Sequence, residues 1–188
     1  KFIGHELFVS LFSLLLRNNR WDICVDLLDE EIYISNQTTQ GLVPFTAVSE
    51  YVRLLNETRN RRLGLNRVSV EADILKHRHS HGELGSIVPF RDFMDAELFL
   101  FLRTEFQFKP DEQDHRWLAF STTFMADEPP IFLVEAERNK YASRLLSPLA
   151  VPNTDQLRAK LSHAIAKLNR CFGRPLRNYD SNKIASRA

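Results

Sequence analysis

The chain has 188 residues, of which 44% are hydrophobic and 26% are charged, and its formal net charge is +1. These values exclude a disordered, collagen-like or low-complexity chain, and near-neutrality argues against a dedicated nucleic-acid or membrane binder. A chain of this length buries about 70% of its unfolded surface without a disulfide or metal. Its two cysteines, Cys24 and Cys171, exclude a disulfide framework and a four-cysteine zinc site.

The first part of the chain is rich in helical periodicity. Apolar residues at spacings of three and four predict helices over 2–17 and 21–35, and the short polar link between them favours an antiparallel helical hairpin. A loop follows, and Pro44 and Thr46 precede a third expected helix. Ser69 is the expected N-cap of a fourth helix that extends to about His79.

The second part centres on a helix expected over 93–106, which is apolar nearly all round and is therefore the predicted buried element. The Ser, Thr and aromatic residues of 117–124 favour a strand or extended segment. Helices are again expected over 131–146 and from Asn153 or Thr154 to about Phe172.

The expected architecture is an all-α, single-domain bundle of six or seven helices over residues 1–173, starting with the helical hairpin. It contains at most one short extended segment, near 117–124, and the composition shift near 109–114 is a candidate subdomain boundary. Residues 174–188 are expected to form a polar peripheral tail.

The apolar run at the start of the chain bears on its location. It is too short for a membrane span, which needs about 20 apolar residues, and it lacks the cleavage site of a secretory signal. We therefore expect a buried first helix, no membrane association and a cytoplasmic location. Because the chain starts at Lys1 and enters a helix at once, we expect it to be a piece of a larger multidomain protein.

Charge is segregated along the chain. Residues 1–58, 59–91, 92–137 and 138–188 carry net charges of −4, +4, −8 and +9. The basic C-terminal part either packs beside the acidic middle part, or leaves surface free for phosphates or an acidic partner. The sequence leaves both interpretations open.

The basic residues between 59 and 78 are the candidate partner- or phosphate-binding residues. Arginine suits bidentate contact with a carboxylate or a phosphate, so nucleic acid is one candidate partner. The candidates are Arg59, Arg61, Arg62, Arg67 and Arg78.

Aromatic residues give a second candidate surface. Fourteen Phe is a high number for this length, and most must lie in the core. Phe106, Phe108 and Trp117 flank an acidic stretch and are the residues chosen for aromatic docking onto another domain or a second copy. Simple core packing is the alternative.

A histidine-rich stretch is the only candidate for a metal. His77 and His81 are one helical turn apart, and Asp73 lies a further turn away, so three ligands would not converge well on one ion. Help would be needed from elsewhere, such as His115, Asp114 or Glu83. The surrounding arginines oppose a dication, and the stretch is better explained as a solvated basic helix end. No cofactor is expected.

Arg158 and His163 are separated by four residues late in a small helical domain, a pattern that resembles the active-site motif of the HEPN ribonucleases. The resemblance covers this motif alone. It implies that the two side chains act near the scissile phosphate and that a dimer interface forms the site. Alternatively, His163 lies on or beside the amphipathic helix face of Leu157 and Leu161.

Other enzyme motifs, including a Gly-rich phosphate loop and a Gly-x-Ser-x-Gly elbow, are absent from the sequence. Neither cysteine has a base beside it in the sequence, so both are expected to be inert core thiols. The sequence therefore predicts a non-catalytic interaction or assembly domain that binds another domain of the same protein or forms a homo-oligomer. The alternatives are a HEPN-like ribonuclease and a nucleic-acid-binding accessory domain.

Overall fold

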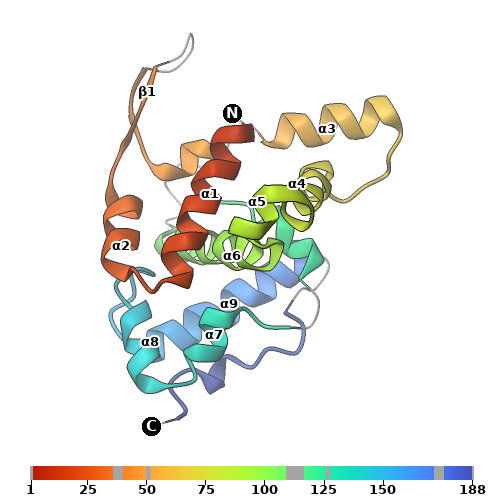
Figure 1. The fold of residues 1–188 in the computed structure, drawn as a ribbon. Helices are drawn as coiled ribbons and strands as arrows, with labels where there is room; N and C mark the ends of the chain where they lie inside the picture. Colours follow the sequence, from red (N-terminus) through yellow and green to blue (C-terminus); the bar gives the residue numbers. More distant parts are fainter. Residues whose placement is uncertain are drawn as a thin grey trace.

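The computed structural model describes residues 2–35, 40–49, 52–108, 117–125, 128–171 and 176–187, and within these ranges the fold is all-α apart from one small hairpin, as expected (Figure 1). In chain order the elements are α1 (Phe2–Arg17), α2 (Trp21–Asp29), β1 (Ile32–Ser35), β2 (Gln40–Val43), the 3-10 helix η1 (Phe45–Val48), α3 (Val52–Leu63), α4 (Val70–Ser80), α5 (Gly82–Ile87), α6 (Phe90–Gln107), the 3-10 helix η2 (Phe120–Phe124), α7 (Ile131–Glu135), α8 (Asn139–Leu145), α9 (Thr154–Cys171) and the 3-10 helix η3 (Ser181–Lys183).

Helix α6 is the centre of the core, as its sequence predicts. Residues 98–102 are all buried, because other elements cover every side of the helix. Helices α1, α4 and α9 and the 3-10 helix η2 all contact it. Elements from both halves of the described chain are therefore packed against one central helix.

The predicted helix over 21–35 is wrong in its second half. Helix α2 ends at Asp29, and the chain then forms β1, which pairs antiparallel with β2. The residues Ile32, Tyr33 and Ile34 favour a strand because β-branched and aromatic side chains suit extended backbone. The hairpin projects from the body of the molecule on the side of α2 (Figure 1).

The extended segment expected near 117–124 is also not a strand. Residues 120–124 form η2, whose backbone is held by local bonds such as Thr122 N–H to the Ala119 carbonyl (3.2 Å). The Thr122 hydroxyl donates to that same carbonyl (2.6 Å). Local bonding by Ser and Thr side chains competes with strand formation, which explains the difference.

The C-terminal segment is part of the core rather than a peripheral tail. Leu176 and Ile184 are buried, and the Ala185 N–H donates to the Ala136 carbonyl (2.8 Å). The Arg187 N–H donates to the Glu137 carbonyl (2.9 Å). Because these carbonyls bond to the C-terminal segment, the single helix expected over 131–146 is divided into α7 and α8. The candidate boundary at 109–114 lies outside the described residues.

Local capping agrees with the sequence at two helices. The Ser69 hydroxyl accepts from the Ala72 N–H (3.0 Å) at the start of α4, and the Asn153 side chain accepts from the Gln156 N–H (2.9 Å) at the start of α9. No helix within the described ranges is long and apolar enough to span a membrane.

Candidate functional site

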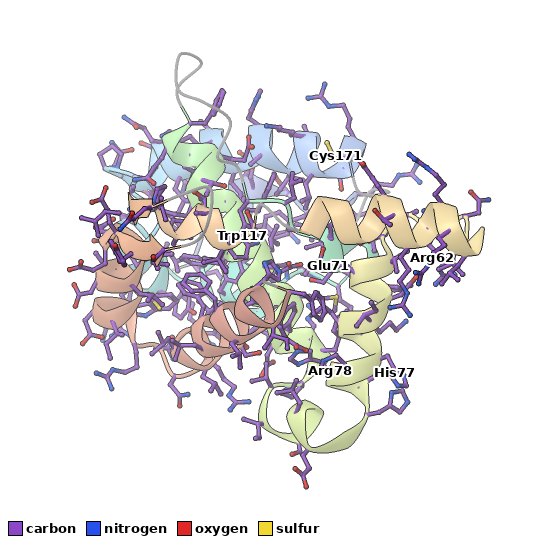
Figure 2. The ribbon with its side chains drawn as sticks, turned by 90° about the horizontal axis from the view of Figure 1, so that it is seen from above. Arg62, Glu71, His77, Arg78, Trp117 and Cys171 are labelled. Atoms are coloured by element: carbon purple, nitrogen blue, oxygen red, sulfur yellow. The ribbon has the colours of Figure 1, made fainter. Side chains whose placement is uncertain are left out.

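Helix α3 carries three of the five predicted arginines. Arg59, Arg61 and Arg62 are all exposed, and no acidic side chain of the described residues lies within ion-pair distance of any of them. The helix projects from the molecule, with Arg62 on its outer part (Figure 2). These three guanidinium groups are therefore free to meet an anionic group from outside.

The other two arginines of the set bind within the molecule. Arg67 forms a bidentate pair with Asp73, with both N–O distances at 2.7 Å. Arg78 Nε donates to Glu6 Oε1 (2.6 Å), and the Glu6 side chain is almost fully buried. Each carboxylate raises the pKa of its arginine, chiefly through the hydrogen bond. Arg67 and Arg78 thus hold α4 to its neighbours and are poorly placed to bind a partner.

One face of helix α1 presents apolar side chains to the outside, while Val9 and Phe12 on its other side are buried in the core. Ile3, Leu7 and Leu11 are 64%, 61% and 48% exposed, and they lie four residues apart on one helix face. We call these three residues the α1 stripe. No charged side chain of α1 between residues 2 and 16 is exposed. The outer face of a surface helix is normally polar, so the exposed apolar face of α1 is unusual.

The polar residues of α1 instead point into the core, which the sequence alone did not reveal. His5 Nε2 donates to Glu97 Oε1 (3.1 Å) and lies 3.7 Å from Glu71 Oε1. The second oxygen of Glu97 accepts from the Ser121 N–H (2.9 Å) and from the Ser121 hydroxyl. These hydrogen bonds offset the cost of removing the Glu97 carboxylate from water, and they link α1, α6 and η2.

Glu6 is the second buried anchor of α1. Its carboxylate accepts from Arg78 and lies 3.4 Å from His79 Nε2. His79 Nδ1 in turn donates to the Val88 carbonyl (2.8 Å). The partners lie more than seventy residues from Glu6 in the sequence, so no local pattern could have identified them. Together the two anchors fix the rotation of α1 that leaves the α1 stripe outside.

The predicted aromatic docking surface is wrong for two of its three residues. Trp117 is fully buried, with its ring 5.0 Å from that of His5 and 6.0 Å from that of Phe45, and it lies inside the molecule in Figure 2. Phe106 is also buried, because it belongs to α6. Phe108 is partly exposed, and Lys167 Nζ lies 5.9 Å from its ring centre. Core packing therefore explains this aromatic cluster.

The histidine pair is present, but the described residues do not complete a metal site around it. The rings of His77 and His81 are 5.0 Å apart, and His81 Nδ1 donates to the His77 carbonyl (3.1 Å). Asp73, the third proposed ligand, is paired with Arg67. No group of three metal-binding side chains occurs within the described ranges, while His115 and Asp114 lie outside them.

Arg158 and His163 take different positions on α9. Arg158 Nε donates to the Ile184 carbonyl (2.9 Å), and its Nη1 lies 2.9 Å from Asp155 Oδ1. His163 is exposed. Residues five apart leave a helix about 140° apart, so the two side chains do not face a common point on this helix.

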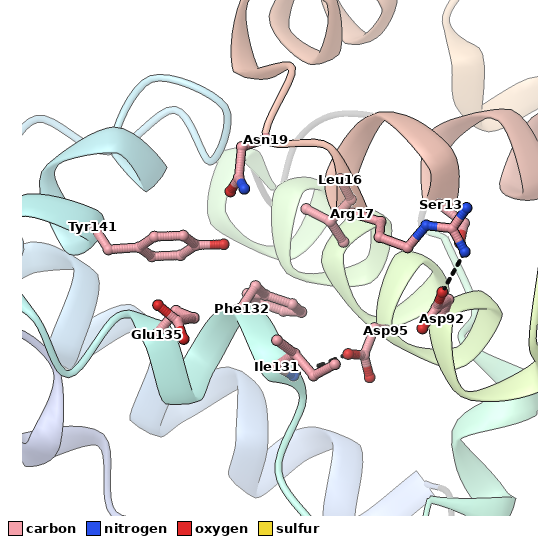
Figure 3. A pocket seen from close by; sticks show the side chains of 10 residues that line it. All are labelled: Ser13, Leu16, Arg17, Asn19, Asp92, Asp95, Ile131, Phe132, Glu135 and Tyr141. Carbon is pink, nitrogen blue, oxygen red and sulfur yellow. Dashed lines mark hydrogen bonds and ion pairs between the residues drawn. The ribbon is translucent and has the colours of Figure 1, made fainter.

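A pocket of about 370 Å³ lies between the end of α1, the start of α6 and the short helices α7 and α8 (Figure 3). Tyr141 points its hydroxyl into this space, and Glu135 lies below it. Burial raises the pKa of Tyr141 to about 12, so its hydroxyl stays protonated at neutral pH and cannot act as a base.

The carboxylates of the pocket already have partners. Arg17 Nη1 donates to Asp92 Oδ2 (3.1 Å), and Arg138 Nη1 donates to Glu135 Oε2 (3.1 Å). Asp95 Oδ2 accepts from the Ile131 N–H (2.9 Å) and so caps α7, while its Oδ1 lies 3.3 Å from Arg91 Nε without hydrogen-bond geometry. These contacts position helices, so each carboxylate that lines the described part of the pocket already has a structural partner.

The two cysteines differ. Cys24 is buried, and burial raises the pKa of its thiol to about 12, as expected for an inert core thiol. Cys171 is exposed at the end of α9 (Figure 2), so the expectation of a core thiol is wrong there.

No family model, curated protein or solved structure matches this chain. Within the described residues, the α1 stripe and the arginines of α3 are among the features that are free to act outward.

Proposed function

We propose that this chain is a non-catalytic assembly domain whose contact surface is the α1 stripe. The observation that supports the proposal is the exposed apolar face of α1, with isoleucine and leucine outside although the inner face already supplies Val9 and Phe12 to the core. Aliphatic side chains gain about 25 cal/mol for each Å² of apolar surface that a partner covers. A stripe with no exposed charge therefore favours burial over contact with water.

The proposed partner of the α1 stripe is a second copy of the chain. A two-fold contact places the same surface of both copies together, so a charged face would repel itself, whereas the uncharged face of α1 does not. Gly4 lies on the same face, and apart from the adjacent backbone of α1 no atom of the described residues lies within 4 Å of where a Cβ at Gly4 would be. The absence of a side chain there lets a second helix approach closely.

The other features of the molecule are consistent with binding rather than catalysis. The pocket carboxylates are paired, and Arg158 contributes to holding the C-terminal segment. Two unpaired cysteines, one of them exposed, suit a reducing compartment, which is part of our proposal of a cytoplasmic location.

Sedimentation equilibrium over a concentration series tests this proposal. At about 0.5 M salt, where charge contacts between copies are screened, we expect the wild type to form a dimer. Leu7→Lys and Leu11→Lys should each weaken that dimer by about tenfold or more, because the substitution buries an unpaired charge. Val134→Lys, at an exposed apolar position on α7, is the matched control and should leave the dimer intact.

Thermal unfolding followed by circular dichroism would establish that each variant is folded. A wild type that remains monomeric throughout the series, or a dimer that both α1 variants retain, would overturn the proposal.

A further inference from the structure

Two projecting parts of the molecule have complementary chemistry. The first, which we call the basic arm, consists of the end of α3 and the loop after it, residues 59–68. It carries the unpaired Arg59, Arg61 and Arg62 together with three exposed aliphatic side chains. These are Leu63, Leu65 and Val68.

The second part, which we call the acidic end, consists of α2 and the β-hairpin. Asp26, Glu30 and Glu31 are exposed, and no basic side chain of the described residues lies within ion-pair distance of them. Tyr33 and Leu42 are directly opposite in the strand register, so they share one face of the hairpin, and they are 60% and 63% exposed. The acidic end therefore offers carboxylates beside an apolar pair.

The basic arm and the acidic end lie on opposite sides of α1 (Figure 1). In the view from above, α3 again projects away from the rest of the chain (Figure 2). Within one molecule the basic arm and the acidic end therefore point away from each other. The basic arm of one molecule can still reach the acidic end of another.

We propose that the basic arm of one copy docks onto the acidic end of the next copy in a head-to-tail contact. Arginines face carboxylates, and the aliphatic side chains of the arm face Tyr33 and Leu42. This contact adds a second, polar interface to the proposed assembly role and does not depend on the α1 dimer. A head-to-tail contact is heterologous, so it continues into a ring or a filament.

A protein surface suits the basic arm better than a nucleic acid does. Phosphates would leave Leu63, Leu65 and Val68 without apolar contacts, and residues 57–68 contain no aromatic side chain for stacking on bases. The exposed carboxylates of the acidic end would also repel a polyanion that approached from that side. Nucleic-acid binding is the competing outcome of the test.

A charge-swap experiment tests the head-to-tail contact. The arm variant combines Arg59→Glu, Arg61→Glu and Arg62→Glu, and the acidic-end variant combines Asp26→Lys, Glu30→Lys and Glu31→Lys. We expect the wild type at about 0.05 M salt to sediment as species larger than at about 0.5 M salt, because screening weakens charge contacts. For each variant alone, the association constant at low salt should fall at least about tenfold, because like charges then face each other.

Mixing the two variants should restore the salt-dependent association, because reversed arms then meet reversed acidic ends. The control combines Lys140→Glu and Arg144→Glu on α8, which reverses exposed, unpaired cations elsewhere and should leave the association unchanged. Circular dichroism would establish that all variants are folded.

Identical sedimentation of the wild type at low and high salt, or a mixture that fails to associate, overturns the head-to-tail contact. Loss of binding to a labelled RNA or DNA oligonucleotide in the arm variant, without any change in self-association, overturns it in favour of nucleic acid. The α1 dimer is tested separately, because it should persist at high salt in both charge-swapped variants and disappear only in Leu7→Lys and Leu11→Lys.

Discussion

Helices α6 and α3 both carry several charges, but they differ in what those charges do. All six charged residues of α6 have partners within the fold, including Glu97 with His5, Arg103 with Asp29 and Glu105 with Lys167. The three arginines in the last part of α3 have none among the described residues. Charge in α6 therefore holds the domain together, whereas charge in α3 is available to a partner.

This difference shows why the net charge of a segment is a poor guide to binding. The C-terminal part carries the largest excess, +9, yet Lys167 is paired with Glu105 (2.6 Å) and Lys160 donates to the Phe106 carbonyl (2.6 Å). Arg138, Arg158 and Arg187 are also paired with carboxylates. The remaining C-terminal cations of the described residues are exposed and without an ion pair, but they are spread over α8, the end of α9 and the C-terminal segment. The segment with the smaller excess, +4, contains a tight group of arginines on α3 that have no ion pair among the described residues.

Arg103→Met would produce the largest loss of stability among the charges of α6. Arg103 is buried and donates to the carbonyls of Ser147 (3.2 Å) and Pro148 (3.0 Å), as well as to Asp29. Without it, both carbonyls lose their donor, so we expect the free energy of unfolding to fall by about 2–4 kcal/mol in urea denaturation. Arg103→Lys should retain part of the lost stability. A decrease in the free energy of unfolding of Arg103→Met below about 1 kcal/mol would show that these bonds contribute little.

Asp95 makes the stability of the domain depend on pH. Burial raises its pKa from 3.8 to about 6, so the folded protein binds this proton more tightly than the unfolded chain does. The resulting stabilisation is complete below about pH 3.8 and is lost as the pH rises through about 6.

Asp95→Asn should remove this pH dependence while keeping an acceptor for the Ile131 N–H. Relative to the wild type, we expect the variant to gain about 1–3 kcal/mol in the free energy of unfolding between pH 4.5 and pH 8. Arg91 and Asp92 of α6 lie beside Asp95, and Arg17, Glu135 and Tyr141 line the same pocket. Chemical denaturation at a series of pH values measures the difference, and parallel curves for the two proteins would contradict the prediction.

Lys167→Met should have a smaller effect because Lys167 is partly exposed. Its Nζ lies 2.6 and 2.8 Å from the two oxygens of Glu105, whose side chain is nearly buried. Losing the cation leaves Glu105 with one partner fewer, at an expected cost of about 1–2 kcal/mol in thermal or urea unfolding. Arg170→Met on the same helix is the control and should change stability by less than about 0.5 kcal/mol. Equal effects of the two substitutions would contradict a specific role for the Lys167–Glu105 pair.

The elements with a strong local signal were predictable from the sequence. The periodic apolar residues of α1, α6 and α9 and the cap at Ser69 all act within a few residues, so the pattern identified these helices. The start of the hairpin was mistaken for helix because Leu28, Ile32 and Tyr33 also fit a helical spacing. Only pairing with β2, which the pattern does not contain, decides between the two.

The surfaces were less predictable than the helices. In α1, apolar residues occur on every side, so the sequence could not tell which side faces the core. The buried partners of His5 and Glu6 decide this, and they come from α4 and α6. The sequence also could not divide the five candidate arginines into paired and unpaired ones. Arg67 and Arg78 form ion pairs that depend on the position of α4 in the fold, whereas the three arginines of α3 form none among the described residues.

The arginines of α3 should contribute least to stability, and this prediction separates α3 most directly from α6. A variant combining Arg59→Ala, Arg61→Ala and Arg62→Ala removes no ion pair within the described residues, and alanine favours helix slightly more than arginine does. We expect the free energy of unfolding, measured in urea at a concentration where the chain is monomeric, to change by less than about 0.5 kcal/mol. A loss above about 1 kcal/mol would mean that these arginines hold the fold, as the charges of α6 do, and would remove the basis for treating α3 as a free surface. An unchanged stability together with a weakened salt-dependent association would place their contribution between molecules instead.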